Sequence, residues 1–149
     1  MELKDWILLI VPIISNGIII FILEKIFEKR RIVRNTKYEY ISTMRRKIDI
    51  SLNLHAQATK KANENENVSS EEINSLIQQY IDSCLDVYYY HIQNKIIFKS
   101  LDDYMERMAV LLKEFSNCIH KDNNGLECSL ILNKIRDILM LTKNSCIEF

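Results

Sequence analysis

Trp6–Leu23 reads WILLIVPIISNGIIIFIL, eighteen residues that carry no charge before Glu24 ends the run. A helix that crosses ~30 Å of hydrocarbon needs about 20 residues, and Ile26 and Phe27 can extend this one. A buried core helix seldom contains so long an uncharged run. The flanks also lack the basic start and the small-residue cleavage site of a signal peptide. The stretch therefore predicts a single transmembrane helix.

The centre of the predicted span is polar and interrupted. Pro12 lacks a backbone donor and clashes one turn back, so we expect a kink there. Asn16 is costly beside lipid and seeks a partner, whereas Ser15 and Gly17 allow close helix approach. These four residues predict a self-association face and hence a homo-oligomer. The alternative is a tolerated polar residue that bonds to its own backbone, and no GxxxG motif decides between the two.

Charge is divided unevenly along a chain whose net charge is zero. Residues 24–62 contain eleven Lys or Arg against four acids, whereas residues 63–149 are acidic overall. A basic flank after the apolar run places the C-terminal side in the cytoplasm and the N-terminus outside the inner (cytoplasmic) membrane. The residues expected to contact lipid head groups are Lys25, Lys29, Arg30, Arg31 and Arg34. Because the membrane already accounts for these charges, nucleic acid is not expected as a partner.

The rest of the chain has the composition of a helical protein. The whole sequence contains two glycines and one proline, too few for the turns that sheets need. We expect an all-α fold in which one N-terminal transmembrane helix precedes a cytoplasmic antiparallel bundle of three to four helices. The expected parts are a transmembrane anchor over 1–27, a basic juxtamembrane helix over 28–62, a polar loop over 63–69, and a bundle over 70–149 that part of 38–62 completes.

Local signals predict the helix boundaries. The first helix continues past the span, either unbroken or with a hinge near residues 34–37, and has apolar residues at helical spacing. That apolar stripe is Ile41, Met44, Ile48 and Leu52. The boundary signals are Ser69 with Glu72 as a capping box, Lys99–Ser100 as an interruption, Ser100 with Asp103 as the next cap, and Asn124 or Gly125 as a left-handed helix ending.

Residues with catalytic or metal-binding chemistry are scattered. The four cysteines form no CxxC pair and lie away from histidines at ligand spacing, which favours reduced thiols over a zinc site. His55, His91 and His120 fall on three different predicted elements. Asp102 and Asp103 suit the first turn of a helix, where the dipole favours negative charge. We therefore predict no catalytic residue, no metal and no cofactor, and do not expect an enzyme.

Three consecutive tyrosines, Tyr88–Tyr90, are the most distinctive local feature. Consecutive helical residues lie ~100° apart, so the three rings cannot all face one core. Since tyrosine is favoured at interfaces, we predict a partner interface that contains Tyr89, Tyr90 and Ile97. The alternative is a central bundle helix that is covered on more than one side.

These features favour a single-pass, membrane-anchored interaction or oligomerisation module. Its expected partners are membrane lipids, further copies of itself and a possible soluble protein. One version is a membrane effector of bacterial phage defence, in which the cytoplasmic bundle controls the span. The alternatives are a membrane-tethered scaffold that recruits a soluble partner, and a holin-like pore former. The abundance of Ile and Asn is typical of AT-rich genomes and favours a bacterial source.

Overall fold

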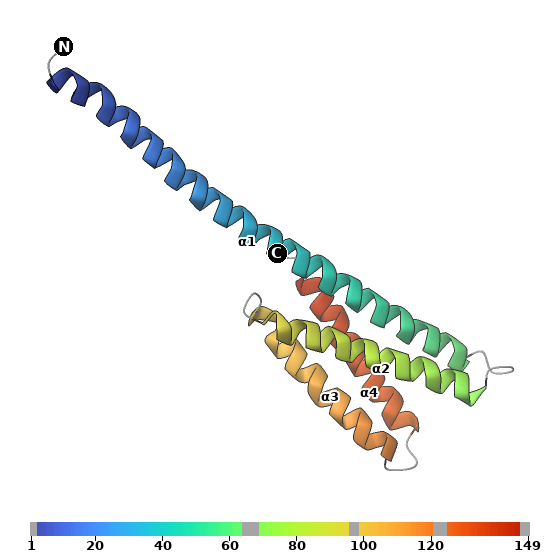
Figure 1. Ribbon diagram of the computed structural model, residues 1–149. Coiled ribbons are helices and arrows are strands. Elements are labelled where there is room, and N and C mark those ends of the chain that lie inside the picture. The colour runs from blue at the N-terminus through green and yellow to red at the C-terminus, as the bar shows by residue number, and fades with distance from the viewer. Residues whose placement is uncertain (1–2, 64–68, 96–98, 121–124, 147–149) are drawn as a thin grey trace. The chain divides into compact units, whose positions relative to one another are not determined.

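The computed structural model describes residues 3–63, 69–95, 99–120 and 125–146, with residues 3–18 and 120 described by their backbone alone. Every regular element among these residues is a helix (Figure 1). The elements are α1 Leu3–Asn63, α2 Ser70–Gln93, the 3-10 helix η1 Lys99–Leu101, α3 Asp102–His120 and α4 Gly125–Ser145. The expected all-α fold is confirmed for this part of the chain.

The chain divides into two compact units, Met1–Glu39 and Tyr40–Phe149. In the first unit, every described side chain from residue 19 to residue 36 is exposed. Residues 34–37, where the sequence allowed a hinge, are helical. The second unit contains the rest of α1 together with α2, α3 and α4, and has a common hydrophobic core.

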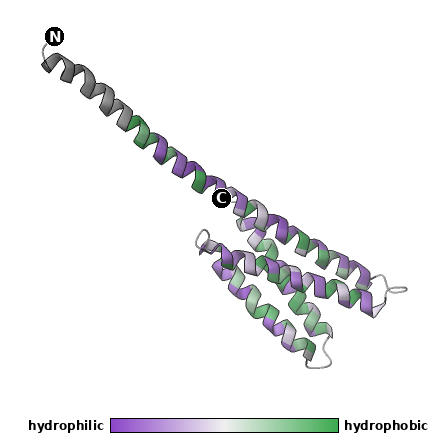
Figure 2. Ribbon diagram, in the orientation of Figure 1, coloured by the Kyte–Doolittle hydropathy of each residue, from purple (hydrophilic) through white to green (hydrophobic). Residues whose placement is uncertain are grey.

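Each helix of the second unit turns one narrow stripe toward that core. The buried residues recur at spacings of three and four, which is the pattern of helices that pack in bundles. Figure 2 shows hydrophobic and hydrophilic residues interspersed along each of these helices. The buried residues are Tyr40, Met44, Ile48, Ser51 and His55 on α1; Tyr80, Cys84, Val87 and His91 on α2; Leu101, Met105, Met108, Leu112 and Phe115 on η1 and α3; and Ile131, Ile135, Leu139, Thr142 and Cys146 on α4 and just after it.

The stripe predicted for α1 is partly right. Met44 and Ile48 are fully buried, whereas Ile41 and Leu52 lie at the margin of the core. The sequence reading missed the polar members of the stripe, Ser51 and His55, which are also buried. The predicted helical spacing of apolar residues was therefore correct, but the buried face of α1 is rotated slightly from the predicted one.

Contacts between α1 and α2 fix their direction. The bonded atoms are Tyr40 Oη and His91 Nδ1 at 2.8 Å, Lys47 Nζ and Asp86 Oδ2 at 2.5 Å, and Ser51 Oγ and Ser83 Oγ at 2.6 Å. Residue numbers rise along α1 as they fall along α2, so the two helices are antiparallel. Helices that are joined in sequence by short connections pack in this way in up-and-down bundles.

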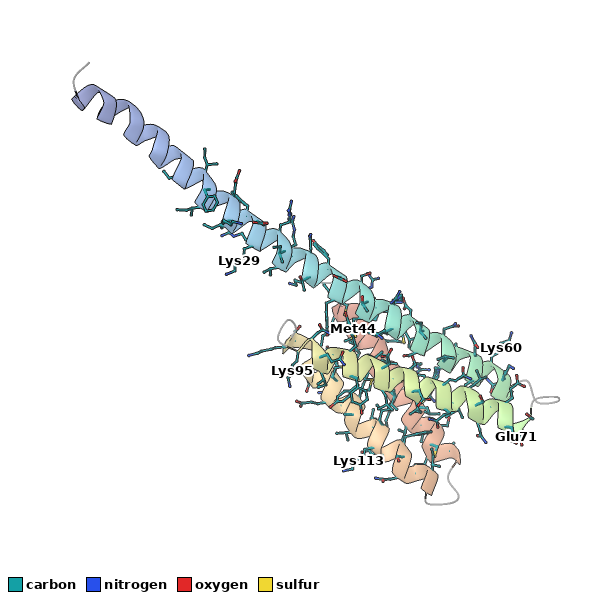
Figure 3. The ribbon with its side chains drawn as sticks, viewed as in Figure 1. Lys29, Met44, Lys60, Glu71, Lys95 and Lys113 are labelled. Carbon is teal, nitrogen blue, oxygen red and sulfur yellow. The ribbon has the colours of Figure 1, made fainter. Side chains whose placement is uncertain are left out.

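The bundle has two ends that differ in chemistry. The Tyr40 end is defined by Tyr40, His91, Asp102 and Cys146, and the Asn63 end by Asn63, Ile73, Phe115, Ile119 and Gly125. Figure 3 labels Lys95 at the Tyr40 end, and Lys60 and Glu71 at the Asn63 end.

Some predicted boundaries are confirmed and others are wrong. Ser69 caps α2 as predicted, since its side chain accepts a hydrogen bond from the Glu72 backbone N–H at 3.2 Å. However, α2 ends at Gln93, before the predicted interruption at Lys99–Ser100, because Asn94 caps it and bonds its side chain to the Tyr90 carbonyl at 2.8 Å.

Corrections also apply around α3. Ser100 lies inside η1, so α3 begins at Asp102 rather than directly after a Ser100 cap. Gly125 is the first residue of α4 and has no left-handed backbone that would end α3, and a Cβ added there would meet nothing within 4 Å. Asn124, the other residue predicted for that ending, lies outside the described residues.

Candidate functional site

An exposed apolar segment, residues 19–27, lies in the first unit. Its large side chains include Ile19, Phe21 and Phe27, which are 54 %, 60 % and 62 % exposed. Among the residues with described side chains, no helix has a stretch long and apolar enough to cross a membrane. The predicted transmembrane helix is therefore unsupported there. Most of that predicted span, including Pro12, Ser15, Asn16 and Gly17, lies outside the residues whose side chains are described.

The basic residues predicted to contact lipid begin inside this segment, at Lys25, and continue after it. They are Lys25, Lys29, Arg30, Arg31 and Arg34, and all five are exposed. Lys25 has two neighbours on its own helix: its Nζ lies 3.1 Å from a Glu28 carboxylate oxygen and 6.0 Å from the centre of the Phe21 ring. A cation that covers an apolar ring while keeping its charge in solvent is typical of the margin between apolar and polar surroundings.

The three tyrosines of α2 have different environments. Tyr90 stacks on Tyr40 with ring centres 5.3 Å apart, and the Lys47 ammonium lies 5.4 Å from the Tyr90 ring centre. Tyr88 packs against the core at its margin, and its ring meets that of Tyr89 edge to face at 5.7 Å. Tyr89 itself is 58 % exposed.

Of the predicted partner interface, Tyr89 alone is an exposed residue with a described side chain. Tyr90 is partly covered within the bundle, and Ile97 lies outside the described residues. Ile92, three positions after Tyr89, is 45 % exposed and therefore shares its helix face. The available apolar surface on α2 is thus Tyr89 and Ile92, and the partner interface itself stays a prediction.

A buried polar cluster joins three helices at the Tyr40 end. His91 is 1 % exposed, and both of its ring nitrogens have partners. Nδ1 lies 2.8 Å from Tyr40 Oη, and Nε2 lies 2.8 Å from Asp102 Oδ1. Lys95 approaches the other Asp102 oxygen at 3.5 Å. We name Tyr40, His91 and Asp102 the histidine relay.

The Tyr40 hydroxyl can act as a donor in the histidine relay. Burial first of all, and then nearby negative groups, raise the pKa of Tyr40, so its hydroxyl stays protonated and donates to His91 Nδ1. His91 Nε2–H then donates to the Asp102 carboxylate, and this bond is the main reason that the pKa of Asp102 is lowered. The relay therefore fixes the start of the bundle part of α1 against α2 and α3.

Sequence reasoning missed the histidine relay. His91 was placed on a different predicted element from the other two histidines, and Asp102 was interpreted as a first-turn acid of the helix that is α3. Asp102 does occupy that first turn, but its carboxylate also bonds to His91. One signal could have revealed His91: it continues the buried stripe of α2 four residues after Val87.

The opposite half of the bundle positions a second histidine differently. His55 is 7 % exposed, and its ring meets the Tyr80 ring edge to face with centres 5.2 Å apart. Burial, and then the charge of Arg136, lower the pKa of His55 despite a hydrogen bond with Asn133. The imidazole is therefore held neutral at the wall of a cavity.

The four cysteines are free thiols, as the sequence predicted for a reducing compartment. Burial raises the pKa of Cys84 to about 12 and that of Cys128 to about 11, where the hydrogen bond with Cys118 adds to the effect. These thiols are therefore protonated near neutral pH and are poor nucleophiles.

Within the described residues, no group of three or more His, Cys, Asp or Glu could bind a metal ion. No known protein family, curated protein or solved structure matches the chain.

Proposed function

We propose that this protein is a single-pass, membrane-anchored helical module whose bundle works at the cytoplasmic face of a bacterial inner membrane. One observation carries the proposal: the exposed apolar residues 19–23 are followed within two positions by the first of the exposed basic residues, Lys25. Contiguous exposed apolar surface of more than a few hundred Å² is unusual in soluble monomers and marks contact with a membrane or a protein. The uncharged sequence that precedes residue 19 favours the membrane.

The basic residues give the anchor a direction. An excess of Lys and Arg on one side of a span keeps that side in the cytoplasm. Each such residue close to anionic lipid contributes ~1 kcal/mol of binding. The five exposed cations from Lys25 to Arg34 therefore stabilise an orientation with the N-terminus outside and the bundle inside.

Membrane association is tested by a double charge substitution, Ile19→Lys with Phe21→Lys, in the full chain. We expect the natural protein to stay with membranes after an alkaline carbonate wash and the variant to be released in large part. The matched control is Leu126→Lys with Leu130→Lys, which adds the same charge to exposed positions of α4. Equal retention of both variants would contradict the anchor.

Orientation is tested with the natural cysteines, which all lie in the bundle unit. A membrane-impermeant maleimide added to intact cells should leave them unlabelled, whereas Cys118, which is partly exposed, should react after the membrane is permeabilised. Labelling on intact cells would reverse the proposed topology.

Self-association of the span is the finer part of the proposal. Pro12, Ser15, Asn16 and Gly17 would form the helix–helix face, because small residues allow close approach and an amide in lipid seeks a partner. In this form the protein would be an effector of bacterial phage defence or a holin-like pore former. Asn16→Leu should reduce oligomer size in detergent and any toxicity on expression. Unchanged values of both would remove the pore-forming version.

A second candidate function is a scaffold that recruits a soluble protein, and the exposure of Tyr89 and Ile92 favours it. The two side chains present apolar area on the outer face of α2, and tyrosine anchors are common in interfaces. Crosslinking of the full chain in cells, compared with Tyr89→Ala, tests this role. Val110→Ala is the control, because Val110 is similarly exposed at 57 % but lies on α3. Loss of the same crosslinked species in both variants, or in neither, would count against the α2 surface.

A further inference from the structure

A cavity of ≈610 Å³ opens at the Asn63 end of the bundle. All four helices contribute to it, with His55 from α1, Tyr80 from α2, Phe115 from α3 and Cys128 from α4 among the wall residues. Its volume falls in the range of small-molecule sites, about 300 to 1,000 Å³.

The cavity wall is free of charged side chains among the described residues that line it. This is unusual in a chain in which 27 % of the residues are charged, because several wall positions, such as Asn74, Gln78 and Ser129, are solvent-exposed. Two other hollows on the bundle surface differ. One contains Lys60, Arg136 and Lys143, and the other contains Asp103, Glu106, Arg107, Lys134 and Asp137.

Polar groups without formal charge are nevertheless present in the wall. The neutral His55 ring offers one donor and one acceptor, and the side chains of Asn74 and Asn133 each carry an amide. The apolar part of the wall includes Ile77 and the aromatic ring of Phe115. A largely apolar wall with a few hydrogen-bonding groups is the usual make-up of a small-molecule pocket.

We propose that this cavity binds an uncharged small molecule that has a planar apolar body and one or two hydrogen-bonding groups, of the aromatic-amide kind. The planar body would lie against Phe115 and the edge of the Tyr80–His55 ring pair, since aromatic rings favour such contacts. Its polar group would bond to the amide and imidazole groups of the wall. An ion would lose its hydration and gain no opposite charge from these residues, which disfavours both anions and cations.

The proposal does not depend on membrane anchoring, and it is tested with the purified full chain and three matched fluorinated probes. The probes are 4-fluorobenzamide, which is neutral, 4-fluorobenzoate, which is an anion, and 4-fluorobenzylammonium, which is a cation. Binding is followed by broadening of the fluorine NMR signal as the protein is titrated. We expect saturable broadening for the neutral amide, and at least tenfold weaker binding for each ion.

Variants locate the binding. Ala58 lines the cavity on α1, so Ala58→Phe fills it and should abolish saturable binding of 4-fluorobenzamide. Ala62→Phe, at the exposed rim of the same wall, provides a second block that leaves the core untouched. The control is Ala56→Phe, because Ala56 is exposed on α1 and lies outside this cavity.

The outcomes separate a cavity site from other uptake of the probe. Loss of binding in Ala58→Phe and Ala62→Phe, with binding retained in Ala56→Phe, supports the cavity. Equal broadening in all three variants would show partition into detergent or onto other apolar surface and would overturn the proposal. Absence of saturable binding to the natural protein, or equal binding of all three probes, would overturn it as well.

Discussion

The two ends of the bundle bury a histidine in opposite ways. At the Tyr40 end, His91 bonds through both ring nitrogens to Tyr40 and Asp102, and the surrounding core is closed. At the Asn63 end, His55 lies at the wall of a cavity. A buried polar group is tolerated when its hydrogen bonds are made, which both histidines achieve with different partners.

The difference indicates that the two ends contribute differently to the stability of the bundle. The buried His91 ring bonds to residues of two other helices, so removal of any one of the three residues breaks at least one hydrogen bond of that ring. A cavity with an uncharged wall has room for a ligand and tolerates larger side chains. We therefore expect the Tyr40 end to hold the bundle together and the Asn63 end to accept substitutions.

The largest expected effect is that of His91→Leu. It removes two hydrogen bonds of a buried side chain, the one to Tyr40 Oη and the one to Asp102, and the loss of such bonds in a buried site costs about 1 to 3 kcal/mol. We expect the free energy of unfolding of the full chain in detergent to fall by roughly 2 to 3 kcal/mol. Denaturant titration followed by circular dichroism measures it.

His55→Leu is the matched substitution at the other end. This substitution removes the hydrogen bond between His55 and Asn133 at the wall of a cavity that water can enter. Because water can replace the lost partner, the free energy of unfolding should fall by about 1 kcal/mol or less. If His55→Leu destabilises the bundle as much as His91→Leu does, the proposed contrast between the ends is wrong.

The second prediction adds volume instead of removing a bond. Val87 is fully buried in the stripe that leads to His91, so Val87→Phe overpacks a closed core and should cost about 1 to 3 kcal/mol. Ala58→Phe points into the cavity and should change the free energy of unfolding by less than about 0.5 kcal/mol. Similar losses in the two variants, measured in the same denaturant titration, would show that the cavity is closed in solution.

The sequence predicted the all-helical bundle correctly, because local spacing of apolar residues indicates helix formation. Met44 and Ile48 lie where the apolar period placed them, and Ser69 caps α2. The end of α2 was predicted too late because residues 96–98 are apolar and no strong breaker precedes Lys99. Asn94 was the available signal, since asparagine is tolerated at helix ends.

The sites were harder to predict, for a physical reason. Tyr40, His91 and Asp102 come from three helices, and only the register between those helices brings them within hydrogen-bonding distance. The cavity likewise depends on all four helices at once. Local sequence patterns indicate neither the register between helices nor how four helices are placed around one cavity. The predicted membrane segment is the reverse case: its uncharged sequence is a clear local signal, but most of its side chains lie outside the described residues.

The third prediction compares two buried tyrosine hydroxyls. Tyr40→Phe removes the donor to His91 Nδ1, which lies 2.8 Å away, and should cost about 1 kcal/mol. Tyr80→Phe removes a longer bond of 3.4 Å to the Leu132 carbonyl and a hydrogen bond with the Cys84 thiol, which is a weak partner, so it should cost less. The two free energies of unfolding can be measured side by side, and a larger loss in Tyr80→Phe would reverse the assignment of the tighter network to the Tyr40 end.

The smallest expected effect is the response to mild acid, and it belongs to the Asn63 end. The pKa of His55 is lowered from its ordinary value of 6.5, first by burial and then by Arg136, so the unfolded chain takes up a proton more readily than the folded one does. Stability contributed by neutral His55 is therefore complete above pH 6.5 and is lost as the pH falls through the lowered folded pKa. Asp102, whose pKa is also lowered, loses its contribution only at more acidic pH, below the ordinary carboxyl value of 3.8.

Between pH 7.5 and 5.5, His55→Leu should consequently show a smaller decline in the free energy of unfolding than the natural protein. An identical decline in both would mean that another group, and not His55, makes the bundle sensitive to mild acid.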